Sequence, residues 1–405
     1  MNVGVLLSEM TPETGGGYTF EREVFAALCR LGGDVRHTFH IISPHAIPLP
    51  PEARHLRLIE IPRQRRFVER LRNAARKTYR FLTKSGRREL RRAKKVGWRE
   101  RFLLSCGMDM LWYPTPSVVT MEIPFITVVW DLQHRLQPYF PEVSLNAEWD
   151  LRERHYAQVL RRATYIVTGT EVGKREIERF YGVPGERMQI LPHPTPEFAF
   201  EPPQGDDDAV LARYDIRRPY VFYPAQFWPH KNHIGLLEAV RLLESRHGLK
   251  VDVVLVGSDK GNRSFVEQAT ARLGITDRVR FPGFVSQHEL VVFYRNALAT
   301  TYVTYFGPEN LPPLESFAAG CPVVASDVSG SEEQLGDAAL RVDPRDHAAI
   351  ADAIFRVHSD AALRTTLVDR GRARATRFRP DDFVREIVGM IDEFEPVRKC
   401  WHGGD

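Results

Sequence analysis

Short apolar runs, each followed by a turn and then by an amphipathic segment of helical period, recur along the chain. This alternation predicts parallel β-strands in sheets that helices cover on both faces. Strands are expected in the first half at 3–7, 38–42, 111–113, 125–129, 165–168 and 189–191. Others are expected in the second half at 220–223, 251–256, 279–281, 299–303 and 322–325. Two such runs predict two parallel sheets and an α/β fold.

The segment between the two runs, residues 191–208, is rich in proline and acidic residues and has no helical or alternating period. It is predicted to link two domains, because a chain of 405 residues exceeds the roughly 250–300 residues that one core serves. We expect an N-terminal domain over 1–198 and a C-terminal domain over 199–378, followed by a segment over 379–405. Helices are expected near the end of the chain at about 346–356, 360–369 and 380–395.

The formal net charge of +4 is unevenly distributed along the chain. Residues 63–101 carry 17 Lys/Arg and three acidic residues, so this segment has a net charge of +14 and the remainder −10. Aromatic residues such as Phe67, Tyr79 and Trp98 are interleaved with the cations. A basic insertion over about 63–104 that meets an anionic membrane or a lipid-diphosphate acceptor is the favoured interpretation. A solvated insertion is an alternative, and nucleic-acid binding is disfavoured because no nucleic-acid module accompanies the charge.

No apolar run approaches the about 20 residues that a membrane-spanning helix needs. The first residues, MNVGVLLSEM, lack the basic and apolar regions of an export signal. We expect a cytoplasmic protein that becomes peripheral on the inner face of the cytoplasmic membrane if its basic segment binds lipid. The cysteines lie far apart and form no metal-ligand motif, so we expect reduced thiols, no metal and no cofactor.

Two features of the first half are candidates for substrate contacts. Gly15–Gly17 follow the first strand and precede a helix expected to start near Tyr18–Glu21. Glycines before a helix N-terminus let a sugar or an anion approach the backbone, although a plain flexible turn also explains them. The strand at 125–129 delivers Asp131 and His134 to the carboxyl end of the sheet, where α/β proteins bind ligands. This pair suits a sugar hydroxyl, and a capping Asp with a surface His is the alternative.

The second half places a lysine between a strand and a helix. Lys231 follows the strand at 220–223 and precedes a helix expected to begin near Asn232 or His233. A cation beside a helix N-terminus is suited to hold a diphosphate, whereas a loop lysine taken alone is usually solvated.

The segment TYFGPENLPPLE (304–315, preceded by the strand at 299–303) predicts a second helix N-terminus in the same domain. Asn310 is expected to be its N-cap, with Pro312 and Pro313 in the first turn. Backbone amides of this turn would bind an anion, and Glu315 would accept hydrogen bonds from a vicinal diol. An acidic residue that simply favours the helix dipole is the alternative for Glu315.

These motifs resemble the retaining GT-B glycosyltransferases, and among them glycosyltransferase family 4 (group 1), which includes O-antigen and polysaccharide mannosyltransferases. The likeness is strongest over 220–343, where PAQFWPHKNH, VVLVG, VRFPGFVSQHELVVFY and FGPENLPPLESFAAGCPVVASD occur in the family's order. The resemblance implies a GT-B fold of two Rossmann-like parallel-sheet domains with an interdomain cleft, and a last helix that returns to the N-terminal domain.

The resemblance also implies roles for single residues. Lys231 would bind the donor diphosphate, Glu315 the ribose hydroxyls, and His134 would lie near the transferred sugar. The predicted catalytic residues are His134, Asp131 and Lys231. The predicted donor-binding residues are Gly16, Gly17, Gln226, Lys231, Asn232, Gly257, Phe284, Val285, Glu309, Asn310, Leu311 and Glu315, with Phe284 and Val285 lining the base.

The sequence departs from the family pattern at two places. Gln226 stands where many relatives have an arginine, so the diphosphate loses one fixed cation. Many relatives also carry a Glu eight positions before the residue that matches Glu315. Here Thr304, Tyr305 or Glu309 takes its place.

The function implied is a retaining, metal-independent hexosyltransferase of bacterial surface polysaccharide synthesis. The first expectation for the donor is GDP-mannose, with GDP favoured over UDP, and for the acceptor a glycan or a lipid-diphosphate-linked glycan. Electrostatic stabilisation of the departing diphosphate would drive the reaction. A sugar-nucleotide epimerase of GT-B-like fold and a non-catalytic nucleotide-sugar-binding partner are the alternatives.

Overall fold

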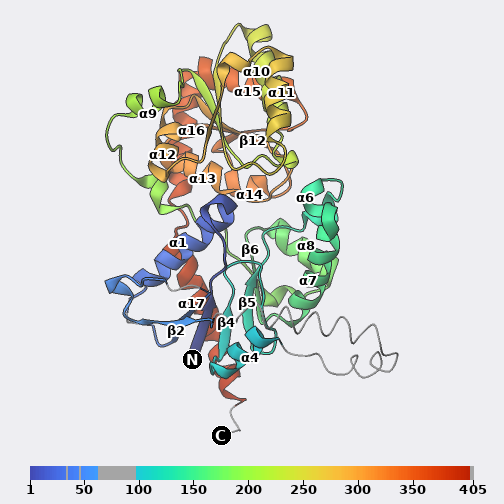
Figure 1. Ribbon diagram of the computed structural model, residues 1–405, viewed down its shortest axis with the longest axis vertical. Coiled ribbons are helices and arrows are strands. Elements are labelled where there is room, and N and C mark those ends of the chain that lie inside the picture. Colours follow the sequence, from blue (N-terminus) through green and yellow to red (C-terminus); the bar gives the residue numbers. More distant parts are fainter. Residues whose placement is uncertain (33–34, 45–46, 63–96, 402–405) are drawn as a thin grey trace.

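Each half of the chain builds one all-parallel sheet in the computed structural model, which describes residues 1–32, 35–44, 47–62 and 97–401 (Figure 1). The seven-stranded sheet of the N-terminal domain has the order β3-β2-β1-β4-β5-β6-β7. Its strands are β1 (Asn2–Leu6), β2 (Thr38–Ser43), β3 (Leu56–Glu60), β4 (Met110–Trp112), β5 (Phe125–Val128), β6 (Tyr165–Thr168) and β7 (Met188–Ile190).

The six-stranded sheet of the C-terminal domain has the order β10-β9-β8-β11-β12-β13. Its strands are β8 (Tyr220–Pro224), β9 (Asp252–Val256), β10 (Val279–Gly283), β11 (Ala299–Tyr302), β12 (Val323–Ser326) and β13 (Ala339–Val342). Central strands are buried along their whole length, as in β8 and β9, because helices cover both faces.

Helices alternate with the strands in both domains. Those of the N-terminal domain are α1 (Gly16–Arg30), α4 (Trp98–Ser105), α5 (Gln133–Leu136), α6 (Pro141–Ser144), α7 (Glu148–Arg162) and α8 (Glu171–Tyr181). Those that follow are α9 (Asp207–Arg213), α10 (His233–His247), α11 (Arg263–Leu273), α12 (Gln287–Asn296), α13 (Leu311–Ala319), α14 (Ser331–Leu335), α15 (His347–Ser359), α16 (Ala361–Ala375) and α17 (Pro380–Lys399). No helix in the described part of the chain is both long and apolar enough to cross a membrane.

The strand order places one topological switch point in each sheet. In both sheets the chain first builds strands toward one edge and then returns to the centre, so β1 and β4 are neighbours in one sheet and β8 and β11 in the other. Ligands of open α/β sheets bind outside the carboxyl ends of the strands at this point. A ligand-binding site is therefore expected at the loops after β1, β8 and β11.

The structure corrects several sequence-based boundaries. β3 and β13 were not predicted because they are edge strands with one fully buried residue each and no continuous apolar run. The predicted linker 191–208 holds a short 3-10 helix, η5 (Glu197–Phe200), and the start of α9, whose N-cap is Asp206. A 3-10 turn of four residues is too short to show a period. The helix expected to start at Tyr18–Glu21 begins earlier, at Gly16.

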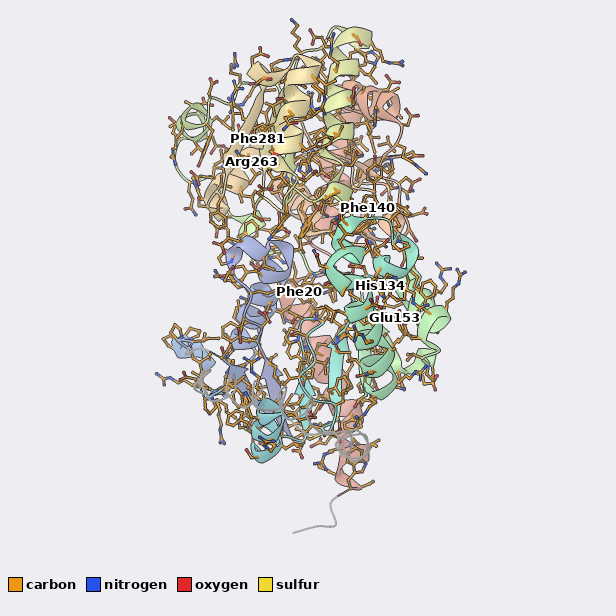
Figure 2. The ribbon with its side chains drawn as sticks, turned by 45° about the vertical axis from the view of Figure 1, so that its right-hand side comes forward. Phe20, His134, Phe140, Glu153, Arg263 and Phe281 are labelled. Atoms are coloured by element: carbon orange, nitrogen blue, oxygen red, sulfur yellow. The ribbon has the colours of Figure 1, made fainter. Side chains whose placement is uncertain are left out.

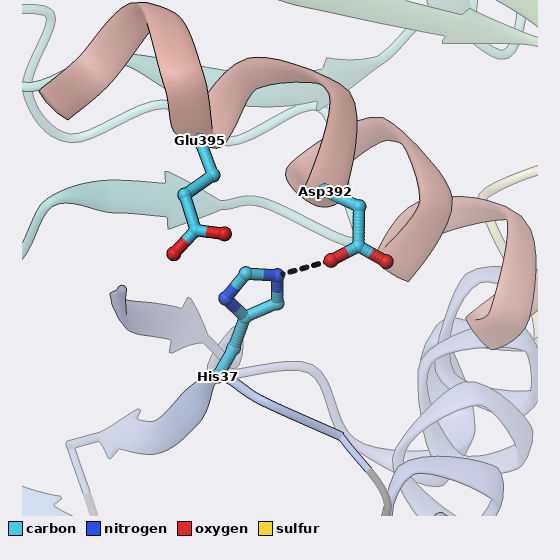
Figure 3. Close-up of side chains that lie close together, drawn as sticks. All are labelled: His37, Asp392 and Glu395. Atoms are coloured by element: carbon cyan, nitrogen blue, oxygen red, sulfur yellow. Dashed lines mark hydrogen bonds and ion pairs between the residues drawn. The ribbon is translucent and has the colours of Figure 1, made fainter. Parts of the chain in front are cut away.

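The last helix, α17, runs along the N-terminal domain and packs against α1 (Figure 1). Its apolar face, with Phe383, Ile387 and Ile391, belongs to the core that contains β1. Polar contacts hold the C-terminal half of α17 to the N-terminal domain, where His37 Nε2 lies 2.9 Å from Asp392 Oδ1 (Figure 3).

The group formed by His37, Asp392 and Glu395 has metal-ligand atoms within 4.8 Å of one another. Protein cations already pair with both carboxylates, because Arg36 Nε lies 2.6 Å from Asp392 and 3.2 Å from Glu395. Lys399 Nζ adds a second contact to Glu395 at 3.1 Å. The group is an ion-pair network that ties α17 to the N-terminal domain.

Candidate functional site

A cavity of about 680 Å³ lies between the two domains, at the carboxyl ends of both sheets. Pockets of this size hold ligands as large as a nucleotide sugar. The N-terminal domain lines it with the first turns of α1 and the end of β5, and the C-terminal domain with the loops after β8, β9, β10 and β11. The cavity thus coincides with the switch points of the two sheets.

Lys231 forms part of the cavity wall and ends the 3-10 helix η6 (Pro229–Lys231). Its ammonium donates to the Tyr302 hydroxyl at 2.9 Å and to Asn310 Oδ1 at 3.4 Å, and it lies 5.1 Å from the centre of the Tyr302 ring. All these acceptors are neutral. No carboxylate of the described residues forms an ion pair with Lys231, so the cleft wall carries a cation whose charge is not compensated by the protein.

The N-terminus of α13 faces the same part of the cavity. Asn310 is its N-cap and prolines occupy its first turn, which confirms this prediction from the sequence. Gln334 of α14 fixes Asn310 through two bonds, since its Oε1 accepts from the Asn310 amide at 3.0 Å and its Nε2 donates to the Asn310 carbonyl at 2.9 Å. The cap that supports the Lys231 ammonium is therefore held rigidly.

Glu315 lies one turn further along α13, 5% exposed, in the cavity wall. Its Oε2 accepts a hydrogen bond of 2.6 Å from the hydroxyl of Tyr294, a fully buried residue of α12. Burial raises the pKa of Glu315 to about 7, and the hydrogen bond from Tyr294 opposes this rise.

Two neighbouring loops complete the wall of the C-terminal domain. A Cβ at Gly257 would lie 2.2 Å from the carbonyl oxygen of Ala225, so only glycine allows the loops after β8 and β9 to lie this close. Gln226 is tied between the domains, because its Nε2 donates to the Glu13 carbonyl at 2.8 Å and to Ser258 Oγ at 2.9 Å.

The loop after β10 presents an apolar surface to the cavity. Phe284 is 70% exposed and lines the cavity together with Val285. An exposed phenylalanine beside a cavity is suited to stack on a planar ring.

Gly15–Gly17 lie in the cavity wall, where Gly15 is the N-cap of α1 and Gly16 and Gly17 begin its first turn. A Cβ at Gly17 would lie 3.2 Å from the Trp130 ring and one at Gly16 would lie 3.9 Å from the Leu311 side chain. Leu311, at the start of α13, packs into the core of the N-terminal domain. The small residues thus let the helix start approach the C-terminal domain.

Asp131 and His134 do not form the pair that the sequence suggested. Asp131 lines the cavity, accepts from the Gln133 amide at 2.9 Å and lies 3.4 Å from Arg152. His134 is fully buried and does not line the cavity. Its ring stacks on Tyr156 and its Nε2 lies 3.2 Å from the Tyr181 hydroxyl.

Figure 2 shows His134 beside Glu153 within the N-terminal domain, below Phe140. The prediction that His134 contacts the transferred sugar therefore does not agree with this structure. Its position in the α5 turn directs the ring into the core, and no periodic signal in such a short helix revealed this direction.

Two predicted donor-binding residues have other structural tasks. Asn232 is 4% exposed, and its side chain accepts from the Gly235 amide and donates to the carbonyls of Val303 and Pro344. Its oxygen caps α10 and its amide nitrogen binds these two carbonyls, so the side chain is not free for a ligand. Glu309 lines the cavity but its carboxylate binds the amide and Nδ1 of His193, both at 2.8 Å.

The three candidates for the missing family glutamate also have contacts within the protein. Thr304 is 1% exposed and its hydroxyl donates to the carbonyls of His230 and Phe306. The Tyr305 carbonyl accepts from Gln137 of the N-terminal domain at 3.3 Å. Of the three candidates only Glu309 has a carboxylate, and that carboxylate is bound to His193 across the cleft.

Sequence reasoning missed several residues that shape this site. Tyr302 supports Lys231, Tyr294 supports Glu315 and Gln334 fixes Asn310, as described above. A fourth is Glu142 of α6, whose carboxylate accepts from the amide of His230 at 3.0 Å and from its ring Nδ1. The only signal for Tyr302 was its place at the end of a buried strand, and nothing in the sequence singled out the others.

His230 itself is held on two sides. Its ring stacks on Phe306 with centres 4.0 Å apart, and Phe140 packs edge-on against both rings. Burial lowers the pKa of His230 to about 4, and the charge of Lys231 acts in the same direction. The imidazole is therefore neutral at neutral pH and adds no charge to the site.

The fold and the cleft define a class. Two parallel-sheet Rossmann-like domains with a cavity between their carboxyl edges constitute the GT-B fold. Sucrose-phosphate synthase from Thermosynechococcus elongatus superimposes with a TM-score of 0.71 at 18% identity, covering 98% of this chain and 99% of that one. Anabaena HepE in complex with UDP-glucose gives 0.70 at 15% identity, covering 97% and 100%.

Residues 212–374 match the family described as glycosyl transferases group 1. O-antigen chain mannosyltransferase B of Escherichia coli is 28% identical over 227 residues, which are 56% of this chain and 60% of that protein. D-inositol 3-phosphate glycosyltransferase of Acidothermus cellulolyticus is 32% identical over 247 residues, or 58% and 54%. The chain thus matches little more than half the length of these curated relatives.

Proposed function

We propose that the protein is a retaining glycosyltransferase that moves a hexose from a nucleoside diphosphate sugar to a glycan or lipid-linked acceptor. The single observation that carries this proposal is the Lys231 ammonium, which faces the cleft with neutral partners only, next to the N-terminus of α13. An uncompensated cation beside a helix N-terminus favours a dianionic group. A diphosphate fits this requirement, and the relatives of the matched segment carry glycosyltransferase names.

Other residues of the cavity wall are suited to bind the ribose and the base of a nucleoside diphosphate sugar. Glu315 would accept hydrogen bonds from the ribose hydroxyls, and Phe284 and Val285 would contact the base. The sugar would then point toward α1 and Asp131, where the N-terminal domain contributes the acceptor side. Lys231 and the α13 amides would stabilise the charge that develops on the departing diphosphate while the acceptor hydroxyl attacks from the same face. His134 has no part in this proposal.

We propose mannose, carried by GDP, as the first donor to test. The support is the name of the Escherichia coli relative, O-antigen chain mannosyltransferase B. HepE was solved with UDP-glucose, so UDP donors belong in the same panel. The acceptors to test are a glycan and a lipid-diphosphate-linked glycan of surface polysaccharide synthesis.

We further propose that the reaction needs no metal ion. Three of the four carboxylates in the cavity wall have protein partners, because Glu309 binds His193, Glu315 binds Tyr294 and Asp131 pairs with Arg152; the fourth is Glu13. Among the described residues, the group with metal-ligand spacing lies at α17, outside the cavity wall. Activity that persists in EDTA would agree with this proposal, and activity restored only by a divalent cation would contradict it.

The basic segment 63–101 stays a prediction, because residues 63–96 lie outside the described part of the chain. We propose that it brings the protein to an anionic membrane surface. Flotation with liposomes that contain or lack anionic lipid tests this directly. Equal binding to both kinds of liposome would remove the proposal, and so would no binding to either.

The decisive assay offers a panel of GDP- and UDP-hexoses with and without acceptor glycans, and measures nucleotide release and the anomeric configuration of the product. The proposal predicts acceptor-dependent release with retained configuration. A changed sugar without transfer would indicate an epimerase, and nucleotide-sugar binding without any turnover would indicate a non-catalytic partner.

A further inference from the structure

The two oxygens of the Glu315 carboxylate have different surroundings. Oε2 accepts the 2.6 Å hydrogen bond from the Tyr294 hydroxyl. Oε1 has no hydrogen-bond partner among the described residues. This atom is not fully buried, and Glu315 lines the cavity, so Oε1 is accessible from the cleft. One oxygen is therefore held from inside the domain, and the other is presented to a ligand.

Tyr294 is a rigid support for this arrangement. Its side chain is fully buried on α12 and packs edge-on against Phe222 of β8, with ring centres 4.9 Å apart. Burial raises the pKa of Tyr294 well above its usual range, so the hydroxyl keeps its proton and donates. The direction of this hydrogen bond is thus fixed, and it favours the ionised form of its acceptor.

We propose that Tyr294 is a positioning residue for the nucleoside of the donor: its hydroxyl fixes the Glu315 carboxylate so that Oε1 faces the ribose hydroxyls. This inference rests on the proposed function, since it assumes that a nucleoside occupies the cleft. Tyr294 does not touch the ligand in this account. It acts only through Glu315.

Ionisable groups around Glu315 set how the site responds to pH. Tyr294 of α12 donates to the carboxylate, and the carboxylate of Glu23 on α1 repels it across the cleft. Charged groups on the other packed elements have other neighbours: Arg372 of α16 meets Gly320 at the far end of α13, and Glu197 of η5 pairs with Arg379. On α12 itself, Arg295 pairs with Asp207 and Glu289 with Arg213. Burial, with Glu23 adding to it, raises the pKa of Glu315 to about 7, so the carboxylate is about half ionised at neutral pH.

A ribose diol donates hydrogen bonds and prefers the ionised carboxylate. Donor affinity should therefore rise about tenfold between pH 6 and pH 8, as the fraction of ionised Glu315 rises. Removing the Tyr294 hydroxyl removes a bond to the ionised form, so the midpoint of this rise should move upward by about one pH unit.

The test measures the dissociation constants of GDP-mannose and UDP-glucose from pH 5.5 to 9 for the full chain and for Tyr294→Phe. Nucleotide sugars are the right probes because their diphosphate has no free terminal phosphate that titrates near neutrality. Tyr214→Phe is the matched control, since its hydroxyl donates to Glu289 at 2.9 Å outside the cavity wall. We expect the midpoint to shift for Tyr294→Phe and to stay unchanged for Tyr214→Phe.

A double-variant cycle separates positioning from a general structural effect. In a Glu315→Gln background the pH dependence should vanish, and adding Tyr294→Phe should change affinity by less than about twofold. If Tyr294→Phe does not fold, the wild-type protein still decides the matter. The donor with 2′-deoxyribose should then lose most of the pH dependence that the ribose form shows.

An unchanged midpoint in Tyr294→Phe would overturn the inference, and so would wild-type affinity that does not depend on pH. The same holds if the Tyr294→Phe effect persists undiminished in the Glu315→Gln background. If neither nucleotide sugar binds the wild-type protein, the inference fails together with the proposed function. Donor binding without the pH response would overturn the inference alone.

Discussion

The switch point of the C-terminal sheet carries a cation and a helix N-terminus with a proline-headed first turn, whereas that of the N-terminal sheet carries three small residues. In the C-terminal domain Lys231 and Asn310 lie in the loops after β8 and β11 and contact each other. In the N-terminal domain Gly15–Gly17 follow β1, and Gly15 and Gly16 leave room for Gln226 and Leu311 of the other domain. The C-terminal domain places Lys231 at its switch point, whereas the charged residues that the N-terminal domain adds to the cavity wall, Glu13, Arg22 and Asp131, accompany a glycine-rich helix start.

The contacts between the domains fall beside the residues that would hold the diphosphate. Glu142 binds His230, the neighbour of Lys231, and His193 binds Glu309, the neighbour of Asn310. Glu333, the neighbour of Gln334, accepts from the first two amides of α8 at 2.6 and 3.0 Å. The N-terminal domain thus supports the site indirectly, by holding the residues next to it.

The largest effect should come from the cation itself. Lys231→Ala should lower turnover by a factor of about 10² to 10³, because one preorganised charge partner of a developing anion contributes about 3–4 kcal/mol. Steady-state kinetics with the best donor of the panel measures this loss. Lys260→Ala is the control, since Lys260 belongs to the same domain but lies outside the cavity wall. Unchanged turnover in Lys231→Ala would contradict the claim that the C-terminal domain provides the cation that stabilises the departing diphosphate.

The next effect concerns support from the N-terminal domain. Glu142→Ala removes the acceptor for two hydrogen bonds to His230 and should reduce turnover about tenfold, since hydrogen bonds to charged groups contribute about 1.5–3 kcal/mol. Glu142→Gln keeps an acceptor oxygen and should recover part of the loss. Glu148→Ala, which breaks only the pair with Arg152 inside the N-terminal domain, is the control. Equal turnover in Glu142→Ala and Glu148→Ala would show that His230 needs no support from the N-terminal domain.

A single methyl group should disturb the contact beside Asn310. A Cβ at Gly169 would lie 1.2 Å from Glu309 Oε2, so Gly169→Ala forces the Glu309 carboxylate away from His193. We expect turnover to fall several-fold, in line with the about 1–3 kcal/mol that overpacking costs. Gly389→Ala, where a Cβ meets nothing within 4 Å, serves as the control. A crystal structure of Gly169→Ala with the Glu309–His193 bond intact would contradict this expectation.

The smallest expected effect is on the pH dependence of the free energy of unfolding, and it comes from His233 in the C-terminal domain. Burial lowers the pKa of His233 to about 3, from a usual value of 6.5, so the unfolded chain binds the proton first. Its contribution to stability is complete above pH 6.5 and is lost as the pH falls toward 3. His233→Phe, whose ring would stack on Phe227 as the imidazole does, should remove about 1 kcal/mol of the acid sensitivity between pH 6.5 and about 5.5.

Urea unfolding at both pH values measures this difference. His347→Phe replaces a histidine of the same domain that is only partly buried, and it should leave the pH dependence unchanged. An equal loss of acid sensitivity in both variants would contradict burial as the cause.

The sequence predicted the site residues of the C-terminal domain better than those of the N-terminal domain. Lys231, Asn310 and Glu315 were predicted because strand, turn and helix signals stand next to one another in the chain. Each of these residues lies in the cavity wall. β13 escaped prediction because Arg341 interrupts its short apolar run at the edge of the sheet.

The side of the cleft that the N-terminal domain lines was predicted less well, and the reason is physical. His134 and Asp131 lie three residues apart, but the short helix α5 turns the His134 ring into the core while Asp131 stays at the cavity. Periodicity in four residues cannot show such a direction. Contacts such as Glu142 to His230 join residues 88 positions apart, and no local pattern encodes them.

The central claim is that a diphosphate lies between the Lys231 ammonium and the N-terminus of α13. A crystal structure of the protein with a bound nucleoside diphosphate sugar tests it most directly. The account predicts a phosphate oxygen within hydrogen-bonding distance of Lys231 Nζ and of a backbone amide at the start of α13, with the ribose at Glu315. A nucleotide bound elsewhere, or one whose phosphates point away from Lys231, would contradict it.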